Sequence, residues 1–375
     1  MNPVIVINAY NRPASLQRLL TSLKLSKLEA GIDIVFSLEY GAHADVAAQV
    51  KNFEWSYGEK TIIQQPSRQG LIGHFMFCGS LTEKYGTIIY LEDDLFLGPD
   101  FYVYAKKILA VYGEEERLAG FSLNALWFNG YLHLPFKPIE DGNPNFFLQV
   151  PWYQGQIYTP TQWAHFKNWY NNYKGVNHAL QIHPIFNNYQ LTDDWFPVKT
   201  QYLIETGKYY CFPRGAQCVN FGDAGTHFKN NTNFFQTELS LGVNTHATYT
   251  SFDESIAVYD SFFELLPERL KRLAPHMATV DVELDLHGTK DFKKMQAEYV
   301  LTPVAAASAV ATYGYEMRPQ ELNIVYNVPG NHFHLARVKD VVDSPRSTAH
   351  FYTQFFYHNR FKLTWKQRFN IFLKK

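Results

Sequence analysis

The chain has 375 residues, of which 46% are hydrophobic and 18% are charged, a composition typical of a folded protein rather than a disordered one. Its 34 basic and 35 acidic side chains give a formal net charge of −1, which argues against nucleic acid as the main partner. Three widely spaced cysteines indicate neither a disulfide framework nor a structural zinc site. The first apolar run is too short for a signal peptide or a membrane span, so we expect a cytoplasmic protein.

The first hundred residues alternate short apolar runs with helical patterns, as in a parallel sheet with crossover helices. Strands are predicted at residues 4–7, 32–38 and 61–64. Apolar residues at three- and four-residue spacing predict a helix after Pro13. A continuous apolar run at 87–91 predicts a central strand that is buried on both faces. The sequence therefore predicts an α/β fold with a mostly parallel sheet flanked by helices.

Helical patterns at residues 70–85 and 100–111 lie on either side of that strand, and Pro99 suits the start of the second helix. After residue 118 turns and aromatic residues become denser, and the periodicity fades. Further along the chain, the pattern predicts a helix near 256–273 and a short strand at 280–286.

These patterns divide the chain into three parts. We expect a first domain over residues 1–230, with two halves at 1–115 and 116–230. A C-terminal extension of mixed α/β structure is expected over 231–350, and a basic tail over 351–375.

Three consecutive acidic residues, Glu92, Asp93 and Asp94, follow the predicted central strand. The carboxyl ends of strands form the ligand sites of open α/β sheets. Three neighbouring carboxylates repel one another unless a cation or solvent relieves them, and one carboxylate with a substrate diphosphate is a usual arrangement for Mg²⁺ or Mn²⁺. The position therefore favours a site for a divalent cation, with a solvated turn as the alternative.

A second acidic pair, Asp193 and Asp194, precedes Trp195. A carboxylate beside a tryptophan is partly desolvated, which raises its proton affinity and suits a general base. An N-cap that opens a helix at Trp195 is an equally good interpretation of the same spacing. The two roles are compatible.

In order and spacing, these residues resemble glycosyltransferases of the GT-A fold that use nucleotide-sugar donors, and especially the N-acetylglucosaminyltransferase I family. The segment 3–13 is similar to the family's first strand and nucleotide-binding loop, which contains Asn8 and Arg12. The resemblance implies that Arg12 contacts the base. It also implies that Glu39, where the family has Asp, reads uracil, and that His74 lies near the donor.

The segment 90–95 resembles the family's acidic metal motif, followed by the same kind of helix. By this resemblance Asp93 lies at the ribose and Asp94 coordinates Mn²⁺ or Mg²⁺. The segment around Asp194 is similar to the one whose second Asp is the catalytic base.

A glycine-containing stretch at residues 221–227 resembles a loop that closes over the donor diphosphate. The resemblance places Thr226 at the donor, and His227 at the phosphates or the metal ion. The resemblance ends near residue 230 and implies that residues 1–230 form the catalytic domain, with a donor-binding half at 1–115 and an acceptor-binding half at 116–230. Residues 285–290 and the aromatic-rich segment after them look like the tails of bacterial capsule or cell-surface glycan transferases.

Together these features predict an inverting, metal-dependent glycosyltransferase that moves a sugar from a nucleoside diphosphate, UDP by resemblance, to a glycan hydroxyl in surface polysaccharide synthesis. A cation at Asp94 would stabilise the leaving diphosphate, and one base on the opposite face, Asp194, implies inversion. A nucleotidyltransferase that makes the sugar nucleotide is an alternative, but residues 9–14 lack its glycine-rich phosphate loop. A non-catalytic glycan-binding protein is another, against which the intact Asp94 and Asp194 argue.

The last residues form an amphipathic pattern. Phe361, Trp365, Phe369 and Phe372 share one helical face, and Lys and Arg occupy much of the rest. This pattern is typical of a helix on an anionic membrane surface, with a tail docked on the core as the alternative. We expect peripheral membrane contact through residues 359–375 and a lipid-linked acceptor.

Overall fold

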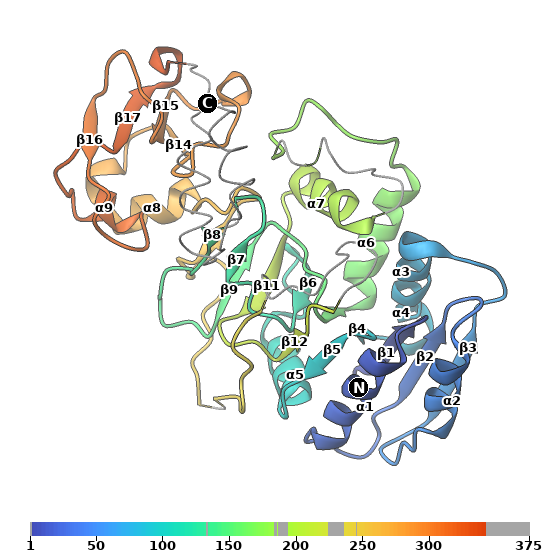
Figure 1. Cartoon of the computed structure of the whole chain (residues 1–375). Helices are drawn as coiled ribbons and strands as arrows, with labels where there is room; N and C mark the ends of the chain where they lie inside the picture. Colours follow the sequence, from blue (N-terminus) through green and yellow to red (C-terminus); the bar gives the residue numbers. More distant parts are fainter. Residues whose placement is uncertain are drawn as a thin grey trace, which may run out of the picture.

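The computed structural model describes residues 2–132, 134–183, 186, 194–223, 236–244 and 246–342. Within these ranges a nine-stranded sheet forms the centre of the protein (Figure 1). Its strands, in spatial order, are β13 (Val258–Tyr259), β9 (Asn145–Leu148), β11 (Tyr209–Pro213), β6 (Leu118–Ser122), β10 (Gln156–Tyr158), β4 (Ile88–Glu92), β1 (Val4–Ala9), β2 (Ile34–Leu38) and β3 (Lys60–Gln64). Five of the eight strand pairs are parallel. The predicted mostly parallel α/β sheet is confirmed.

Helices cover both faces of this sheet because its strands are apolar on both sides. One face packs against α1 (Pro13–Leu25), α2 (Ala44–Asn52) and α5 (Phe101–Tyr112). The other face packs against α3 (Gly70–Ser80), α4 (Thr82–Tyr85), α6 (Pro160–Asn171) and α7 (Trp195–Thr206). Alternation along β1 explains the division, since Val4 and Val6 join one core while Ile5 and Ile7 join the other.

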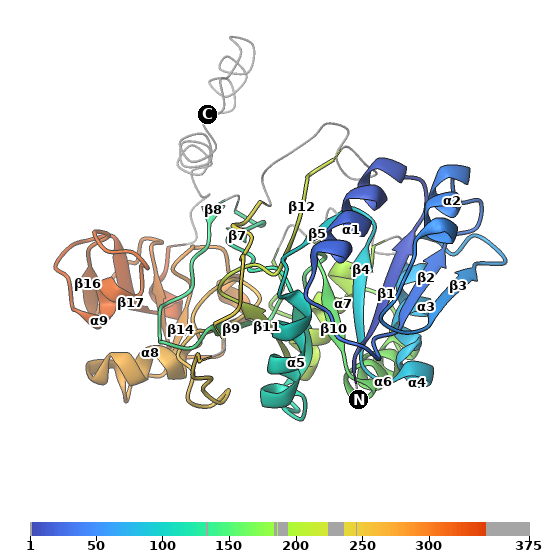
Figure 2. The ribbon, with the colours of Figure 1, turned by 90° about the horizontal axis from the view of Figure 1, so that it is seen from below.

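A smaller four-stranded sheet lies beyond the β13 edge, far from β3 (Figure 2). Its strands, in spatial order, are β14 (Val282–Leu284), β15 (Tyr299–Thr302), β17 (Phe333–Arg337) and β16 (Ala311–Tyr313). Together with α8 (Pro267–Leu273) and α9 (Leu322–Val325), it forms what we call the C-terminal module, residues 267–342.

One predicted element is wrong. The expected helix over 256–273 is present only as α8, because residues 258–259 form β13 and a turn follows in which Phe263 has a φ of 63°. The turn buries Phe262 and Phe263. The apolar spacing that predicted a helix here therefore arises from residues of a strand and a turn that are both buried.

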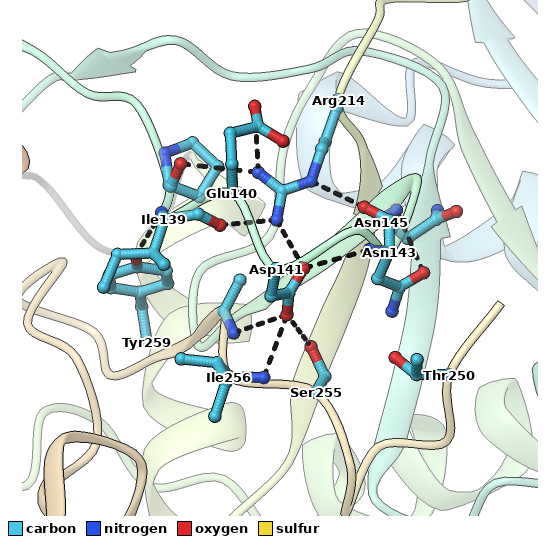
Figure 3. Close-up of polar contacts among 12 residues, drawn as sticks. Ile139, Glu140, Asp141, Asn143, Asn145, Arg214, Thr250, Ser255, Ile256 and Tyr259 are labelled. Carbon is cyan, nitrogen blue, oxygen red and sulfur yellow. Dashed lines mark hydrogen bonds and ion pairs between the residues drawn. The ribbon is translucent and has the colours of Figure 1, made fainter. Parts of the chain in front are cut away.

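A buried polar network lies next to β13, at one edge of the central sheet (Figure 3). The Asp141 carboxylate accepts hydrogen bonds from the N–H groups of Ile256 and Ala257, at 2.9 and 3.0 Å, and from the Arg214 guanidinium at 2.8 Å. Arg214 also donates to the carbonyl of Asn143 at 2.6 Å. Burial alone would raise the pKa of Asp141, but these donors lower it. These hydrogen bonds connect Arg214, just after β11, with the residues just before β13.

Candidate active site

The order of the central strands places a topological switch point beside β1. The chain passes from β1 to β2 and β3, and then returns to β4 on the other side of β1. Such a switch leaves room for a ligand at the carboxyl ends of the strands. Arg12 follows β1, Glu39 follows β2, and the acidic motif, Glu92 to Asp94, begins at the last residue of β4. The fold therefore brings together side chains that lie far apart in the sequence.

Arg12 is bonded to two members of the acidic motif. Its guanidinium donates to Asp93 at 2.6 Å and to Asp94 at 2.8 Å. The Tyr10 N–H also donates to Asp93, at 3.3 Å. The Asp93 side chain is 5% exposed and that of Asp94 is 18% exposed, so Asp94 is the more accessible carboxylate. Contact between Arg12 and a base stays a prediction from the resemblance.

Burial and the repulsion of neighbouring carboxylates make Glu92 and Asp93 bind protons more readily. Burial raises the pKa of Asp93 to about 6, although Arg12 opposes this shift. Burial and then the charge of Asp94 raise the pKa of Glu92 to about 8, and the charge of Asp194 adds to this effect. Asp194 therefore lies close enough to act electrostatically on the acidic motif.

Two polar side chains at the strand ends have oxygens without partners. Asn8 and Glu92 are opposite each other on the paired strands β1 and β4. Asn8 Oδ1 and Glu92 Oε1 are buried and accept no hydrogen bond from the described residues. Buried acceptors of this kind carry a free-energy cost unless a ligand donor or a cation reaches them. Their position is consistent with the expected contact between Asn8 and a donor.

Asp194 opens helix α7. Its Oδ1 accepts the N–H of Phe196 at 2.9 Å, so the N-cap interpretation of the sequence is confirmed. The ring of Trp195 stacks on Phe75 of α3 with 4.5 Å between ring centroids. This contact holds the start of α7 against the helix that follows β3. The role of Asp194 as a general base stays a prediction.

Glu39 and His74 have structural partners. The Glu39 carboxylate accepts three backbone N–H groups, those of Tyr40, Gln69 and Gly70, at 2.7, 3.0 and 3.1 Å. It therefore satisfies N–H groups at the start of α3. His74 is buried, with Nε2 at 2.7 Å from Ser37 Oγ, and burial lowers its pKa. Its Nδ1 lies 3.9 Å from Glu39. The expected contacts of both residues with the donor stay predictions.

A short ribbon continues from the acidic motif. Strand β5 (Leu95–Leu97) follows Asp94 directly and pairs antiparallel with β12 (Cys218–Asn220). Just after β12, the Phe221 ring lies 4.3 Å from the Arg18 guanidinium carbon. Asp223 accepts a hydrogen bond from Ser15 at 2.8 Å and forms an ion pair with Arg18. Residues 221–223 therefore lie against α1, close to the acidic motif.

Several predicted residues lie outside the described part of the chain. These are Asp193, Thr226, His227 and the tail, 351–375. Among the residues that are described, no three His, Cys, Asp or Glu side chains are grouped so that they could hold a metal ion.

The acidic motif nevertheless suits Mn²⁺ or Mg²⁺. Carboxylate oxygens are the donors that these ions prefer, and Mg²⁺ commonly uses one or two carboxylates together with substrate phosphates and water. Asp94 is the most suitable ligand because it is more exposed than Asp93. A site of this kind is completed by the oxygens of the donor.

Sequence reasoning missed the buried Lys199 on α7. Its Nζ lies 3.8 Å from the ring centroid of Tyr158 and 4.4 Å from that of Phe166. No described residue accepts a hydrogen bond from it, and burial lowers its pKa well below the ordinary value. Lys199 is followed by Thr200 and Gln201 on the same helix, so the sequence contained no signal that Lys199 in particular is buried.

Comparison with known proteins gave distant structural similarity only. No protein-family model and no curated protein matches the sequence. Residues 1–349 of TarS from S. aureus match with 12% identity and a TM-score of 0.37, over 58% of this chain and 60% of that one, and a TarS complex with UDP-GlcNAc matches at 0.34 over the same shares. A mannosyltransferase from Pyrobaculum calidifontis, in complex with GDP-Man and Mn²⁺, matches with 9% identity and a TM-score of 0.32, over 45% of this chain and 47% of that one. The chain thus spans about 60% of the TarS fragment, and the case for a function rests on the site.

Proposed function

We propose that the protein is an inverting, metal-dependent glycosyltransferase that moves a sugar from UDP to a hydroxyl of a glycan acceptor. One observation supports this proposal above the others. The acidic motif lies at the switch point beside β1, is bonded to Arg12, and is within electrostatic reach of Asp194. One site thus combines carboxylates for a cation with a separate carboxylate for proton transfer.

The side chains have distinct roles in this reaction. Asp94 holds the cation, which when bound neutralises the diphosphate leaving group. Arg12 orients Asp93 and Asp94 through its two hydrogen bonds. Asp194 takes the proton of the acceptor hydroxyl, a contribution worth about 10²–10⁴ in rate. With a single base opposite the leaving group, the anomeric carbon inverts.

The remaining assignments of the donor site come from the sequence resemblance. Asp93 contacts the ribose, Asn8 lines the donor site, Glu39 lies at the base, and His74 lies near the donor. Thr226 and His227 lie at the donor phosphates and the cation.

The proposed setting is the synthesis of a surface polysaccharide such as a capsule. The acceptor is a lipid-linked glycan on the inner face of a membrane, which residues 359–375 contact from the cytoplasm. Among the described residues, no helix is long and apolar enough to cross a membrane.

Calorimetric titration of UDP with and without Mn²⁺ tests the proposal. We expect UDP to bind more tightly with Mn²⁺, and Asp94→Asn to weaken that binding tenfold or more because a cation ligand is lost. Asp45→Asn is the matched control, since Asp45 is exposed on α2. If Mn²⁺-dependent affinity is the same in Asp94→Asn and the wild type, the assignment of Asp94 is wrong. If no nucleoside diphosphate binds with or without Mn²⁺, the proposed function is wrong.

A further inference from the structure

Residues 285–294, which we call the coupling segment, contact two other parts of the protein. The segment begins directly after β14 and ends with a short 3₁₀ helix, Phe292–Lys294. One side of it contacts residues 260–264, the turn that follows β13. The other side contacts residues 178–181, in the connection between α6 and α7. The C-terminal module therefore reaches both the edge of the central sheet and the chain that leads toward Asp194.

Two ion pairs hold the coupling segment to the turn. Lys290 Nζ lies 2.5 Å from Asp260 Oδ2, and His287 Nδ1 lies 2.9 Å from Glu264 Oε1. The backbone N–H of His287 donates to the same Glu264 oxygen at 2.8 Å. The Lys290 side chain is 8% exposed and that of Glu264 is fully buried. Removing one partner of such a pair leaves a buried charge uncompensated, which strongly destabilises the local structure.

The turn itself depends on Asp260. Asp260 Oδ1 accepts the N–H groups of Phe262 and Glu264, at 2.8 and 3.0 Å. Between them, Phe263 has a φ of 63°, a left-handed conformation that is unfavourable for an aromatic residue. Lys290 thus stabilises a carboxylate that holds a strained turn in place.

The opposite side of the coupling segment bonds to the backbone and side chains of the α6–α7 connection. Lys294 Nζ donates to the carbonyls of His178 and Leu180, at 2.6 and 2.7 Å. Gln181 donates to the Asp291 carbonyl at 2.9 Å and accepts the Asp291 N–H at 3.2 Å. These four hydrogen bonds are made within a few residues of Lys290. Displacement of the segment would therefore remove support from residues 178–181.

The groups around His287 make this support dependent on its proton. Three carboxylates face it, those of Glu264, Asp285 and Glu321, and the Gln320 amide lies 3.3 Å from Nε2. Burial alone would lower the pKa of His287, but the charge of Glu264 raises it above the ordinary value. Burial raises the pKa of Glu321 to about 7, and the charge of Glu264 adds to this shift.

The sign of the pH effect follows from these two groups. Both have a folded-state pKa above the unfolded one, so each stabilises the fold at low pH. The contribution of Glu321 is lost between about pH 4.3 and its raised value. The contribution of His287 is complete below about pH 6.5 and is lost as the pH rises through its raised value. At a pH above both pKa values, the carboxylates of Glu264, Asp285 and Glu321 share a buried site in which Lys290 is a nearby cation.

We propose that Lys290 and protonated His287 are positioning residues, which through the coupling segment hold residues 177–183 and thereby the hydrogen bonds of Asn177 to Gln201 and Glu205 of α7. The proposal rests on the proposed function only in taking Asp194 as the base at the start of α7. Its structural part concerns the order of residues 177–183 and needs neither donor nor cation.

Hydrogen–deuterium exchange of the full chain tests this proposal without a ligand. We would follow peptides that cover residues 172–183, with those covering α5 as an internal reference, at about pH 6 and about pH 8.5, correcting for the intrinsic pH dependence of exchange. The Leu180 N–H, bonded to the Asn177 carbonyl, is one reporter. In the wild type, corrected exchange over 172–183 should rise several-fold at the higher pH, while α5 stays unchanged.

Variants test whether the protection of residues 172–183 depends on the two ion pairs or on other parts of the coupling segment. Lys290→Met should speed exchange over 172–183 by tenfold or more, and Lys290→Arg should restore protection. Lys293→Met, at an exposed position on the 3₁₀ helix that ends the coupling segment, should have no effect. His287→Gln should reduce the pH dependence to the part that Glu321 contributes.

Equal corrected exchange at both pH values in the wild type would overturn the role of His287, even if Lys290→Met failed to fold. Unchanged exchange in a folded Lys290→Met would overturn the role of Lys290. Because no donor is present, failure to bind UDP would leave both results interpretable.

Discussion

Arg12→Met tests how the acidic motif is stabilised when no ligand is bound. The substitution keeps an unbranched side chain but removes the hydrogen bonds to Asp93 and Asp94, at 2.6 and 2.8 Å. Asp93 then keeps the Tyr10 N–H, which carries no formal charge. Three neighbouring carboxylates, those of Glu92, Asp93 and Asp94, would lose the cation that now faces them.

The expected cost follows from burial. Removing one partner of a buried ion pair costs about 3–5 kcal/mol. The Arg12 side chain is 31% exposed, so solvent screens part of the charge, and we expect a loss of about 2–3 kcal/mol at neutral pH. Without Arg12, the pKa of Asp93 would rise further from its present value of about 6. The variant should therefore lose less stability below that pH, where Asp93 is protonated.

Urea unfolding with and without Mn²⁺ measures this effect, because urea does not screen charge. Mn²⁺ should stabilise Arg12→Met more than the wild type, since the ion replaces the lost positive charge. Arg68→Met is the control, because Arg68 is exposed and lies beyond β3. A loss below about 0.5 kcal/mol, the range of ordinary surface substitutions, or an equal effect of Mn²⁺ on both proteins, would refute the reasoning.

Two further substitutions test the base and the edge of the central sheet. Asp194→Asn should keep the N-cap of α7, since Asn caps as well as Asp, and leave UDP affinity unchanged while turnover falls about a hundredfold or more; turnover above about half the wild-type value would exclude the base role. Asp141→Ala should lower the free energy of unfolding by about 3–5 kcal/mol, measured in urea, because Arg214 loses a buried partner. A loss under about 1 kcal/mol would contradict the importance assigned to that network.

The first four strands could be predicted from the sequence because each is a separate apolar run with a turn or helix on either side. A short strand was also predicted at 280–286, where β14 lies. The strands β9, β10 and β13 of the central sheet could not be predicted, since they have only two to four residues each and are defined by neighbours far away in the chain. The helix predicted over 256–273 failed for a related reason. Tertiary burial of Phe262 and Phe263 produced the spacing of an amphipathic helix.

The position of the acidic motif and the N-cap role of Asp194 were predictable because both depend on local sequence. The bonds from Arg12 to Asp93 and Asp94 were not, because they depend on β1 and β4 being neighbours in the sheet. The backbone N–H groups bonded to Glu39 were also beyond prediction. A sequence shows which side chains are acidic but not which backbone groups will face them.

The strand order also has a consequence for biosynthesis. Strands β1 to β4 are completed by residue 92 and pair with one another, so this half can fold as it leaves the ribosome. The other edge of β4 stays unpaired until β10, which begins at Gln156, has been synthesised. A nascent chain or fragment that ends before Gln156 exposes an apolar strand edge that readily pairs with other molecules. Shortened forms that lack β10 should therefore aggregate, and expression of residues 1–115 alone requires that this edge be protected.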